Sequence, residues 1–135
     1  MPRSVVSLAL AAILVSALTG CSRTAAPVPL PPQTVGSTTV TLTSGSLAHT
    51  GDNTLTLTLA DAATGMPVGN ANITATPEML SPRLPGSSTT GRTQGNGLYT
   101  IPVRLGVASR YNITLKIERP GKAAAEASFM VEASQ

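Results

Sequence analysis

The sequence predicts an all-β protein, an immunoglobulin-like antiparallel β-sandwich of about seven short strands. Three observations lead to this prediction. Apolar and polar residues alternate with a period of two in six stretches after residue 36, which is typical of strands with one buried face. Clusters of Gly, Pro and Asn separate these stretches. No stretch after residue 36 shows the 3.6-residue apolar stripe of an amphipathic helix.

The six stretches are expected to form the main strands in chain order. They are residues 39–43, 54–59, 71–76, 99–105, 111–118 and 127–132. A seventh, short edge strand is expected at 89–93, within the irregular, proline-containing region 77–94. Pro102 lies inside one stretch, on its polar side. Because proline lacks the amide donor of a central strand, we expect an edge position or a bulge there.

A different kind of segment precedes the predicted sandwich, which we place at residues 37–135. Residues 5–18 are almost entirely apolar and follow a short cationic start that contains Arg3. As a helix this run would span about 21 Å, less than the roughly 30 Å hydrocarbon core of a bilayer. The pattern therefore predicts a helical signal peptide over residues 1–20, removed by cleavage, and not a membrane-spanning helix.

The apolar run ends in Leu18-Thr19-Gly20-Cys21, which resembles the lipobox of bacterial lipoproteins. The resemblance implies cleavage between Gly20 and Cys21 and attachment of diacylglycerol to the Cys21 thiol, the only thiol in the chain. It places the protein in the bacterial cell envelope with the membrane as its first partner. Ser22 implies the outer membrane in bacteria with two membranes, and otherwise the outer face of the cytoplasmic membrane. A secreted protein with a fortuitous cysteine is the alternative.

Residues 21–36 are expected to form the lipidated N-terminus and a disordered tether. Pro27, Pro29, Pro31 and Pro32 remove backbone donors and fix φ, which favours an extended polyproline II spacer. The fifteen residues 22–36, at about 3.1 Å each, would span roughly 45 Å. A ligand for a proline-recognising module is the alternative function of this segment.

Residues from about 52 to 133 resemble the YtkA-like/FixH-like domain family. The residues that carry the resemblance are Leu-Thr-Leu-Thr-Leu at 55–59, Asp61, Gly65, Pro67-Val68, Asn70-Ala71-Asn72-Ile73, Pro77-Glu78-Met79, Gly97-Leu98-Tyr99 and Phe129-Met130-Val131. The resemblance implies a small envelope domain of the immunoglobulin type. Some members are associated with copper or other metals.

Four residues are candidate metal ligands. Thioether sulfur suits Cu(I), so Met66, Met79 and Met130 could converge with His49, the only histidine. The competing interpretation is that the methionines fill gaps at sheet edges and that His49 is an exposed turn residue. We favour this interpretation and expect no metal or cofactor.

The remaining chemistry points away from catalysis and nucleic-acid binding. His49 is the only base of the usual kind at neutral pH, and no pattern pairs it with a nucleophile, so no catalytic residues are expected. The formal net charge is only +3, and the basic residues are scattered along the chain. The chain also has only two Tyr, one Phe and no Trp. Both features are unlike those of a nucleic-acid binder.

We therefore expect a non-enzymatic, lipid-anchored envelope module. Its partner would be another envelope protein, contacted through an exposed strand edge or through residues 77–94. One alternative is a copper-handling accessory protein. The other is an adhesive, carbohydrate- or surface-binding sandwich, which would expose Tyr99 or Tyr111 as an aromatic platform.

Overall fold

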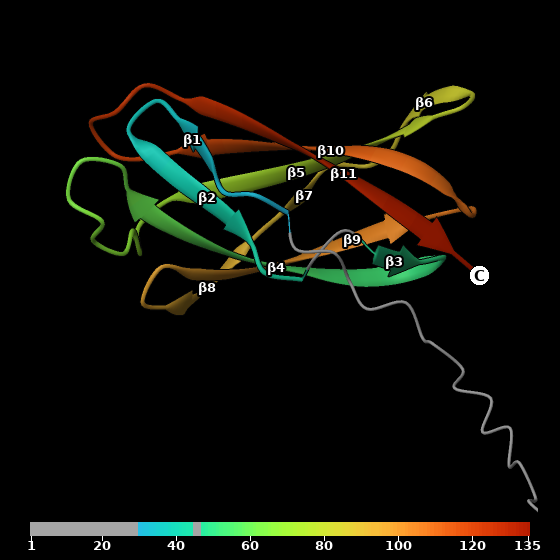
Figure 1. Cartoon of the computed structure of the whole chain (residues 1–135), viewed down its shortest axis with the longest axis horizontal. Coiled ribbons are helices and arrows are strands. Elements are labelled where there is room, and N and C mark those ends of the chain that lie inside the picture. The colour runs from blue at the N-terminus through green and yellow to red at the C-terminus, as the bar shows by residue number, and fades with distance from the viewer. Residues whose placement is uncertain (1–29, 45–46) are drawn as a thin grey trace, which may run out of the picture.

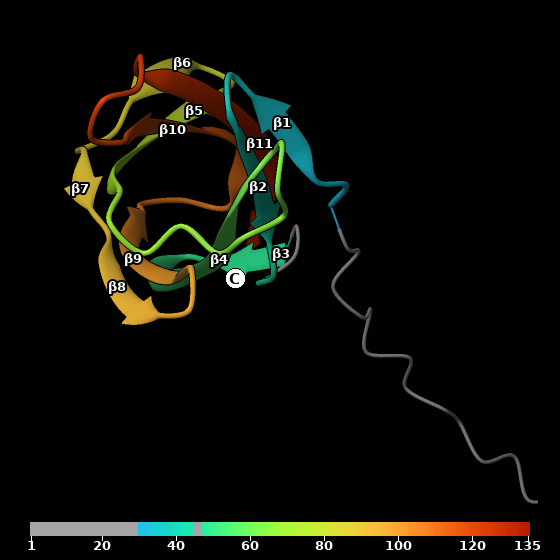
Figure 2. The same cartoon turned by 90° about the vertical axis from the view of Figure 1, so that its left-hand side faces the viewer.

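The computed structural model describes residues 30–44 and 47–135. Signal peptide, cleavage site, Cys21 and residues 22–29 lie outside the described residues. The described residues form two β-sheets packed face to face, as Figure 1 shows from the side and Figure 2 along the sandwich. They contain no helix, and hence none long and apolar enough to cross a membrane. The all-β prediction is confirmed.

The strand order is that of an immunoglobulin domain. The first sheet contains, in spatial order, β1 (Gln33–Val35), β2 (Thr38–Leu42), β4 (Gly51–Asp61), β9 (Leu98–Leu105) and β8 (Arg92–Gly95). The second contains β3 (Leu47–His49), β11 (Ala125–Ser134), β10 (Ser109–Glu118), β5 (Asn72–Leu80) and β6 (Arg83–Pro85), with β7 (Thr89–Thr90) also paired to β5. The series β2-β4-β9-β8 and β11-β10-β5 correspond to the ABED and GFC sheets. Among the described strands, only β3 and β11 pair in parallel.

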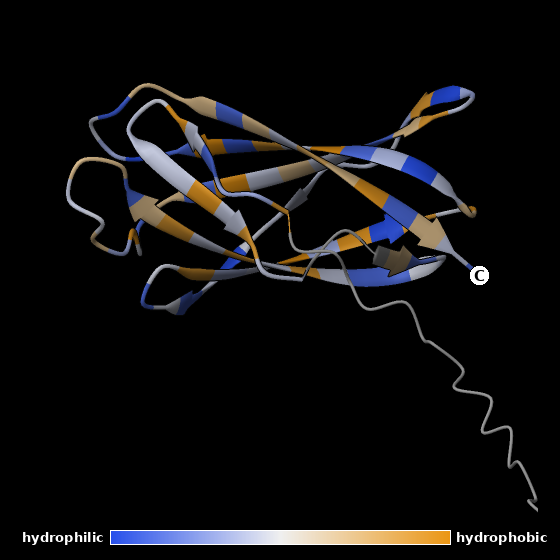
Figure 3. Cartoon of the chain, viewed as in Figure 1, coloured by the Kyte–Doolittle hydropathy of each residue, from blue (hydrophilic) through white to orange (hydrophobic). Residues whose placement is uncertain are grey.

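Alternation along the strands builds the core. The inward-facing residues are mostly Leu, Ile and Val, and the outward-facing ones are mostly polar. Figure 3 shows the corresponding bands of differing hydropathy along the strands. The most deeply buried large side chains include Leu57, Ile101 and Leu115. Tyr99, Tyr111 and Phe129, the three aromatic residues of the chain, are also buried. No aromatic platform is therefore exposed, and the adhesive alternative loses its expected binding surface.

Three strands were not expected from the alternation, namely β1, β3 and β6, each three residues long. Residues 33–35 were assigned to the tether, and this part of the assignment is wrong. The last proline of the expected tether is Pro32, so Gln33 and the residues directly after it again have amide donors for a strand ladder. The Gln33 side-chain amide also donates to Ser128 O (2.6 Å) and accepts from Ser128 N (3.3 Å), which fastens β1 to β11.

The single strand expected at 89–93 is split between the two sheets. β7 pairs with β5 in one sheet, β8 pairs with β9 in the other, and Gly91 connects them. A Cβ on Gly91 would lie 2.9 Å from Ile101 Cγ1. Only glycine therefore lets the backbone pass this close to the buried Ile101 as it moves from one sheet to the other. Pro102 lies in β9 beyond the last pair with β8, Arg92 with Thr100. Its carbonyl accepts from the Thr89 hydroxyl. β9 is an interior strand, so Pro102 occupies an edge only locally, where the pairing with β8 has ended.

The hydroxyls of the two tyrosines bind to loop backbone. Tyr99 donates to Val68 O (2.8 Å) and accepts from Ala71 N (3.1 Å), which fastens the loop between β4 and β5. Tyr111 donates to Val107 O (3.0 Å) and accepts from Val107 N (3.2 Å). The latter is a tyrosine corner of the immunoglobulin type, on the strand that corresponds to F.

Replacing Tyr99 by phenylalanine is expected to lower the free energy of unfolding by about 1–3 kcal/mol, because Val68 is buried and its carbonyl loses its partner without access to water. Tyr111→Phe is the matched control, with a smaller expected loss because Val107 is half exposed and water can replace the hydroxyl. Urea unfolding of both variants measures the difference. Equal losses would contradict this account.

Candidate functional site

The structure does not bring the candidate metal ligands together. His49 lies just before the first residue of β4, whereas Met66 lies beyond the last residue of β4. Asp61 N, at the end of β4, donates a hydrogen bond to Met66 O. His49 and Met66 are therefore separated by the length of β4, whose eleven residues span about 36 Å. Met79 pairs with Tyr111 on the inward side of β5, whereas Met130 pairs with Asn112 and is exposed. The two methionines therefore lie on opposite faces of the same sheet.

Distances within that sheet separate the other pairs. His49 pairs with Ser134, and Met130 lies four residues upstream on β11, which corresponds to about 13 Å. The order β3-β11-β10-β5 places His49 three strand spacings from Met79, about 14 Å. Copper bonds to nitrogen and sulfur require ligands within a few ångströms of one point. Within residues 30–44 and 47–135, no three His, Cys, Asp or Glu side chains are grouped to hold a metal either.

An apolar hollow lies at one end of the sandwich, where the β5–β6 hairpin meets the turn between β9 and β10. Its volume is about 250 Å³. Leu84 and Val107 stand at its margin and are 53% and 51% exposed. The other lining residues are Pro77, Met79, Pro85, Gly86, Arg104, Gly106 and Tyr111. We call this feature the apolar hollow; it includes Met79 and part of region 77–94, but not His49.

Both walls of the apolar hollow are held in place. On the hairpin, Gly86 N donates to Pro77 O (2.6 Å), and a Cβ on Gly86 would lie 2.8 Å from Pro77 Cγ. The Arg83–Glu78 ion pair (2.6 Å) joins the two hairpin strands on the surface. On the other wall, the Tyr111 corner fixes the backbone of Val107. The hollow is thus formed before anything binds.

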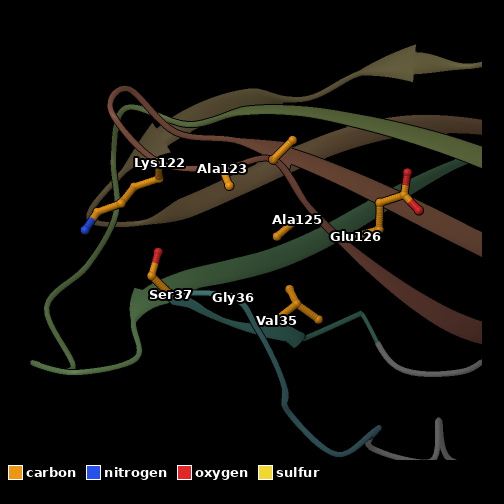
Figure 4. A pocket seen from close by; sticks show the side chains of 8 residues that line it. Val35, Gly36, Ser37, Lys122, Ala123, Ala125 and Glu126 are labelled. Carbon is orange, nitrogen blue, oxygen red and sulfur yellow. The ribbon is translucent and has the colours of Figure 1, made fainter.

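A second, larger hollow lies at the opposite end, between the β1–β2 turn and the segment before β11 (Figure 4). Its volume is about 500 Å³, and it is lined by Val35, Gly36, Ser37, Lys122, Ala123, Ala124, Ala125 and Glu126. The side chains are small, with one cation and one carboxylate at the margin. Ser37 is its only hydroxyl, and that oxygen accepts from Arg119 (3.3 Å). This composition suits a contact surface and provides no catalytic base beside the hydroxyl.

Arg119 and Asp61 join the segments at this end. Arg119 donates to Asp61 Oδ2 (3.1 Å), Ser37 O (3.0 Å) and Thr38 Oγ1 (3.1 Å). Asp61 Oδ1 accepts from the backbone of Ala63 and Thr64. The hydrogen bond from Arg119, followed by those two backbone bonds, holds the pKa of Asp61 below its ordinary value. Sequence reasoning assigned neither residue this role, because the partners lie 58 positions apart.

Because the pKa of Asp61 is lowered in the folded protein, the free energy of unfolding depends on pH in the acidic range. The folded form binds this proton less readily than the unfolded form, so the contribution is present above about pH 4 and is lost as pH falls through the folded pKa. Asp61→Asn is expected to flatten the decline in unfolding free energy below about pH 4. Glu118→Gln is the control. A hydrogen bond from Lys116 also lowers the Glu118 pKa, but both side chains of this pair are exposed. Added salt should therefore weaken the Lys116–Glu118 pair more than the Arg119–Asp61 pair. Urea titrations at stepped pH measure both.

The edge of β8 is an open strand edge among the described residues, as is that of the shorter β6. All four residues of β8 are exposed, and β9 covers one side only. No described strand pairs with the other side. Unpaired backbone groups on such an edge can accept a strand from another chain. This edge lies partly within region 77–94, the region expected to contact a partner.

Comparison with known proteins supports the fold. A crystal structure of a DUF4426 family protein from Pseudomonas aeruginosa superimposes on the chain with a TM-score of 0.54 and 17% sequence identity. The match covers 78% of this chain and 97% of that protein. No protein-family model matches the chain, and no curated protein sequence matches it. The β-sandwich is therefore shared with a known structure, and the YtkA-like/FixH-like resemblance stays a prediction.

Proposed function

We propose that this protein is a lipid-anchored, non-enzymatic binding module of the bacterial cell envelope, with a YtkA-like/FixH-like type of sandwich. The observation that carries the proposal is Cys21, the only cysteine, at the end of Leu18-Thr19-Gly20-Cys21 and behind an apolar run. The sandwich begins within fifteen residues of it, at β1. Acyl chains on one thiol anchor such a domain without a membrane-spanning helix.

The mass of the mature protein tests the anchor. Protein extracted by detergent from its own bacterial membrane should begin at Cys21 and carry the added mass of a diacylglyceryl group. Proteolysis should assign this mass to the N-terminal peptide. An unmodified Cys21, or a mature chain that retains residues 1–20, would refute the proposal.

Binding, and not catalysis, agrees best with the described surfaces. The two hollows lack a nucleophile paired with a base, and the features that remain are an apolar hollow, a hollow with small side chains and the open edge of β8. For the protein partner we propose the β8 edge, by strand addition. The copper-handling alternative is not favoured, because His49, Met66, Met79 and Met130 lie apart.

Site-specific photocross-linking tests the partner surface. A photoreactive residue in place of Thr93 on β8 should yield a cross-linked envelope protein in intact cells. The same residue in place of Lys116, exposed on β10 in the other sheet and outside both hollows, serves as the control. Recovery of monomer only from the Thr93 position would count against strand addition at β8.

A further inference from the structure

The exposed large apolar side chains of the described residues are distributed unevenly. Met66, Leu84, Val107 and Met130 are the four that stand out. Met66 lies alone in the loop after β4, and Met130 lies alone on the outer face of β11. Leu84 and Val107 instead share the margin of the apolar hollow, with Pro77, Met79 and Pro85 behind them. That end of the sandwich therefore presents a continuous apolar surface, whereas the other two methionines are isolated.

Strand direction relates this end to the N-terminal segment. β1 and β4 both pair antiparallel with β2, so they run in the same direction. β4 begins at Gly51, which pairs with Leu105 directly before the turn that contains Val107. The chain therefore approaches β1 running away from the end with the apolar hollow, and β1 begins level with Leu59, because Gln33 pairs with Val40 and Val40 pairs with Leu59. Leu30, at the start of the described residues, packs against the core and fixes this point of entry to the sandwich.

The length of the connecting chain limits how far the sandwich can lie from an anchor at Cys21. Eight residues separate Cys21 from Leu30, and a fully extended chain of this length spans about 30 Å. The sandwich itself is about 36 Å long along β4. A bilayer that holds Cys21 is thus always within about one domain length of Leu30. This reach exceeds the roughly 26 Å of β4 between Leu59 and Gly51, so the tether is long enough to let the end with the apolar hollow meet the bilayer.

We infer that the apolar hollow is a lipid-contacting surface, with Leu84 and Val107 entering the interfacial region of the bilayer in which Cys21 is anchored; this inference rests on the proposed function. The charges around the hollow are balanced, because Arg83 is paired with Glu78 and Arg104 lies opposite Asp52 in the β4–β9 register. Contact therefore depends on apolar burial and not on anionic lipid. It orients the sandwich upright, with the second hollow directed away from the membrane.

Single tryptophans report this contact without background, because the chain has no Trp. The full acylated protein is reconstituted in phosphatidylcholine vesicles whose acyl chains carry bromine, a contact quencher of tryptophan. Val107→Trp and Leu84→Trp should show blue-shifted emission that bromolipid quenches several-fold more strongly than that of Met66→Trp. Met66 is the matched control, since it is 65% exposed at the opposite end. Adding Leu84→Asp to Val107→Trp should lower the ratio of docked to undocked sandwich roughly tenfold.

The outcomes separate the inference from the proposed function. Strong quenching at positions 84 and 107, unchanged when anionic lipid is added, supports the inference. Equal quenching at position 66, or none at 84 and 107 in protein whose mass shows acylation, overturns it and leaves the anchor in place. Quenching that requires anionic lipid also overturns it, since a charge-driven contact is then responsible. Absence of acylation at Cys21 refutes the proposed function, and the inference with it.

Discussion

Replacing Cys21 by serine is expected to abolish fatty-acid labelling of the protein and to leave residues 1–20 attached. A serine hydroxyl is far less nucleophilic than a thiolate, so the lipid transfer that we propose, and the cleavage that would follow it, should not take place. Each buried methylene contributes about 0.8 kcal/mol to membrane binding, and a single acyl chain holds only marginally. Two chains on one thioether hold stably, and the variant has neither.

The measurement needs two arms, because an uncleaved apolar leader can itself retain a protein at the membrane. In the first arm, labelled fatty acid should be incorporated by the native chain and not by Cys21→Ser. In the second, the variant carries the cleavable signal peptide of a secreted protein and should be recovered in the soluble fraction. Ser22→Ala is the matched control and should keep both label and membrane fraction. Label on the Cys21→Ser variant would show that the lipid is attached elsewhere.

Gly97→Ala is expected to produce the largest loss of stability among single-methyl additions, about 2–5 kcal/mol. Gly97 has φ of +74°, and a Cβ there would lie 2.5 Å from Leu59 O and 3.2 Å from Val68 N. Both of these atoms belong to backbone, and the third close atom is Cβ of Pro67 (3.0 Å), so no flexible side chain can rotate aside. In addition, Leu59 N donates to Gly97 O (2.8 Å), so a shift of the turn breaks a bond between β4 and the β8–β9 turn.

Gly69→Ala is the control for Gly97→Ala. Gly69 lies in a nearby loop, has ordinary φ, and has no atom within 4 Å of the Cβ position. The added methyl should therefore change the unfolding free energy by less than about 1 kcal/mol, with slight stabilisation from the less flexible unfolded chain. Urea unfolding midpoints of the two variants measure the contrast. Similar midpoints for both would show that the turn relaxes around the new methyl group.

Local alternation was sufficient to predict most of the sandwich. The stretches at 39–43, 54–59 and 111–118 became β2, β4 and β10, because a period of two directs every second side chain to one face and that face is buried. Short strands such as β3 and β6 could not be found in this way. Three residues show too little periodicity, and these strands exist because their backbones pair with β11 and β5.

The candidate site was predicted only in part. Region 77–94 was expected to contact a partner because prolines and small polar residues interrupt the alternation, and it does contribute the β5–β6 wall of the apolar hollow and the edge of β8. The opposite wall comes from Val107 and Tyr111, more than twenty positions away. No local pattern relates the two walls. His49 and the methionines, grouped by chemistry alone, are separated by the lengths of the strands between them.

The amino-acid sequence by itself determined the class of fold and the positions of its main strands, because these depend on side-chain period. The lipid attachment that we propose at Cys21 likewise rests on a short contiguous motif. Tertiary structure alone decided which ends of the strands meet, that Arg119 binds Asp61, and that Gly91 and Gly97 must be glycines. Each of these depends on backbone segments brought within a few ångströms by the packing of two sheets. These short distances follow from the strand order and register of the two sheets. Neither can be read from a local stretch of the sequence.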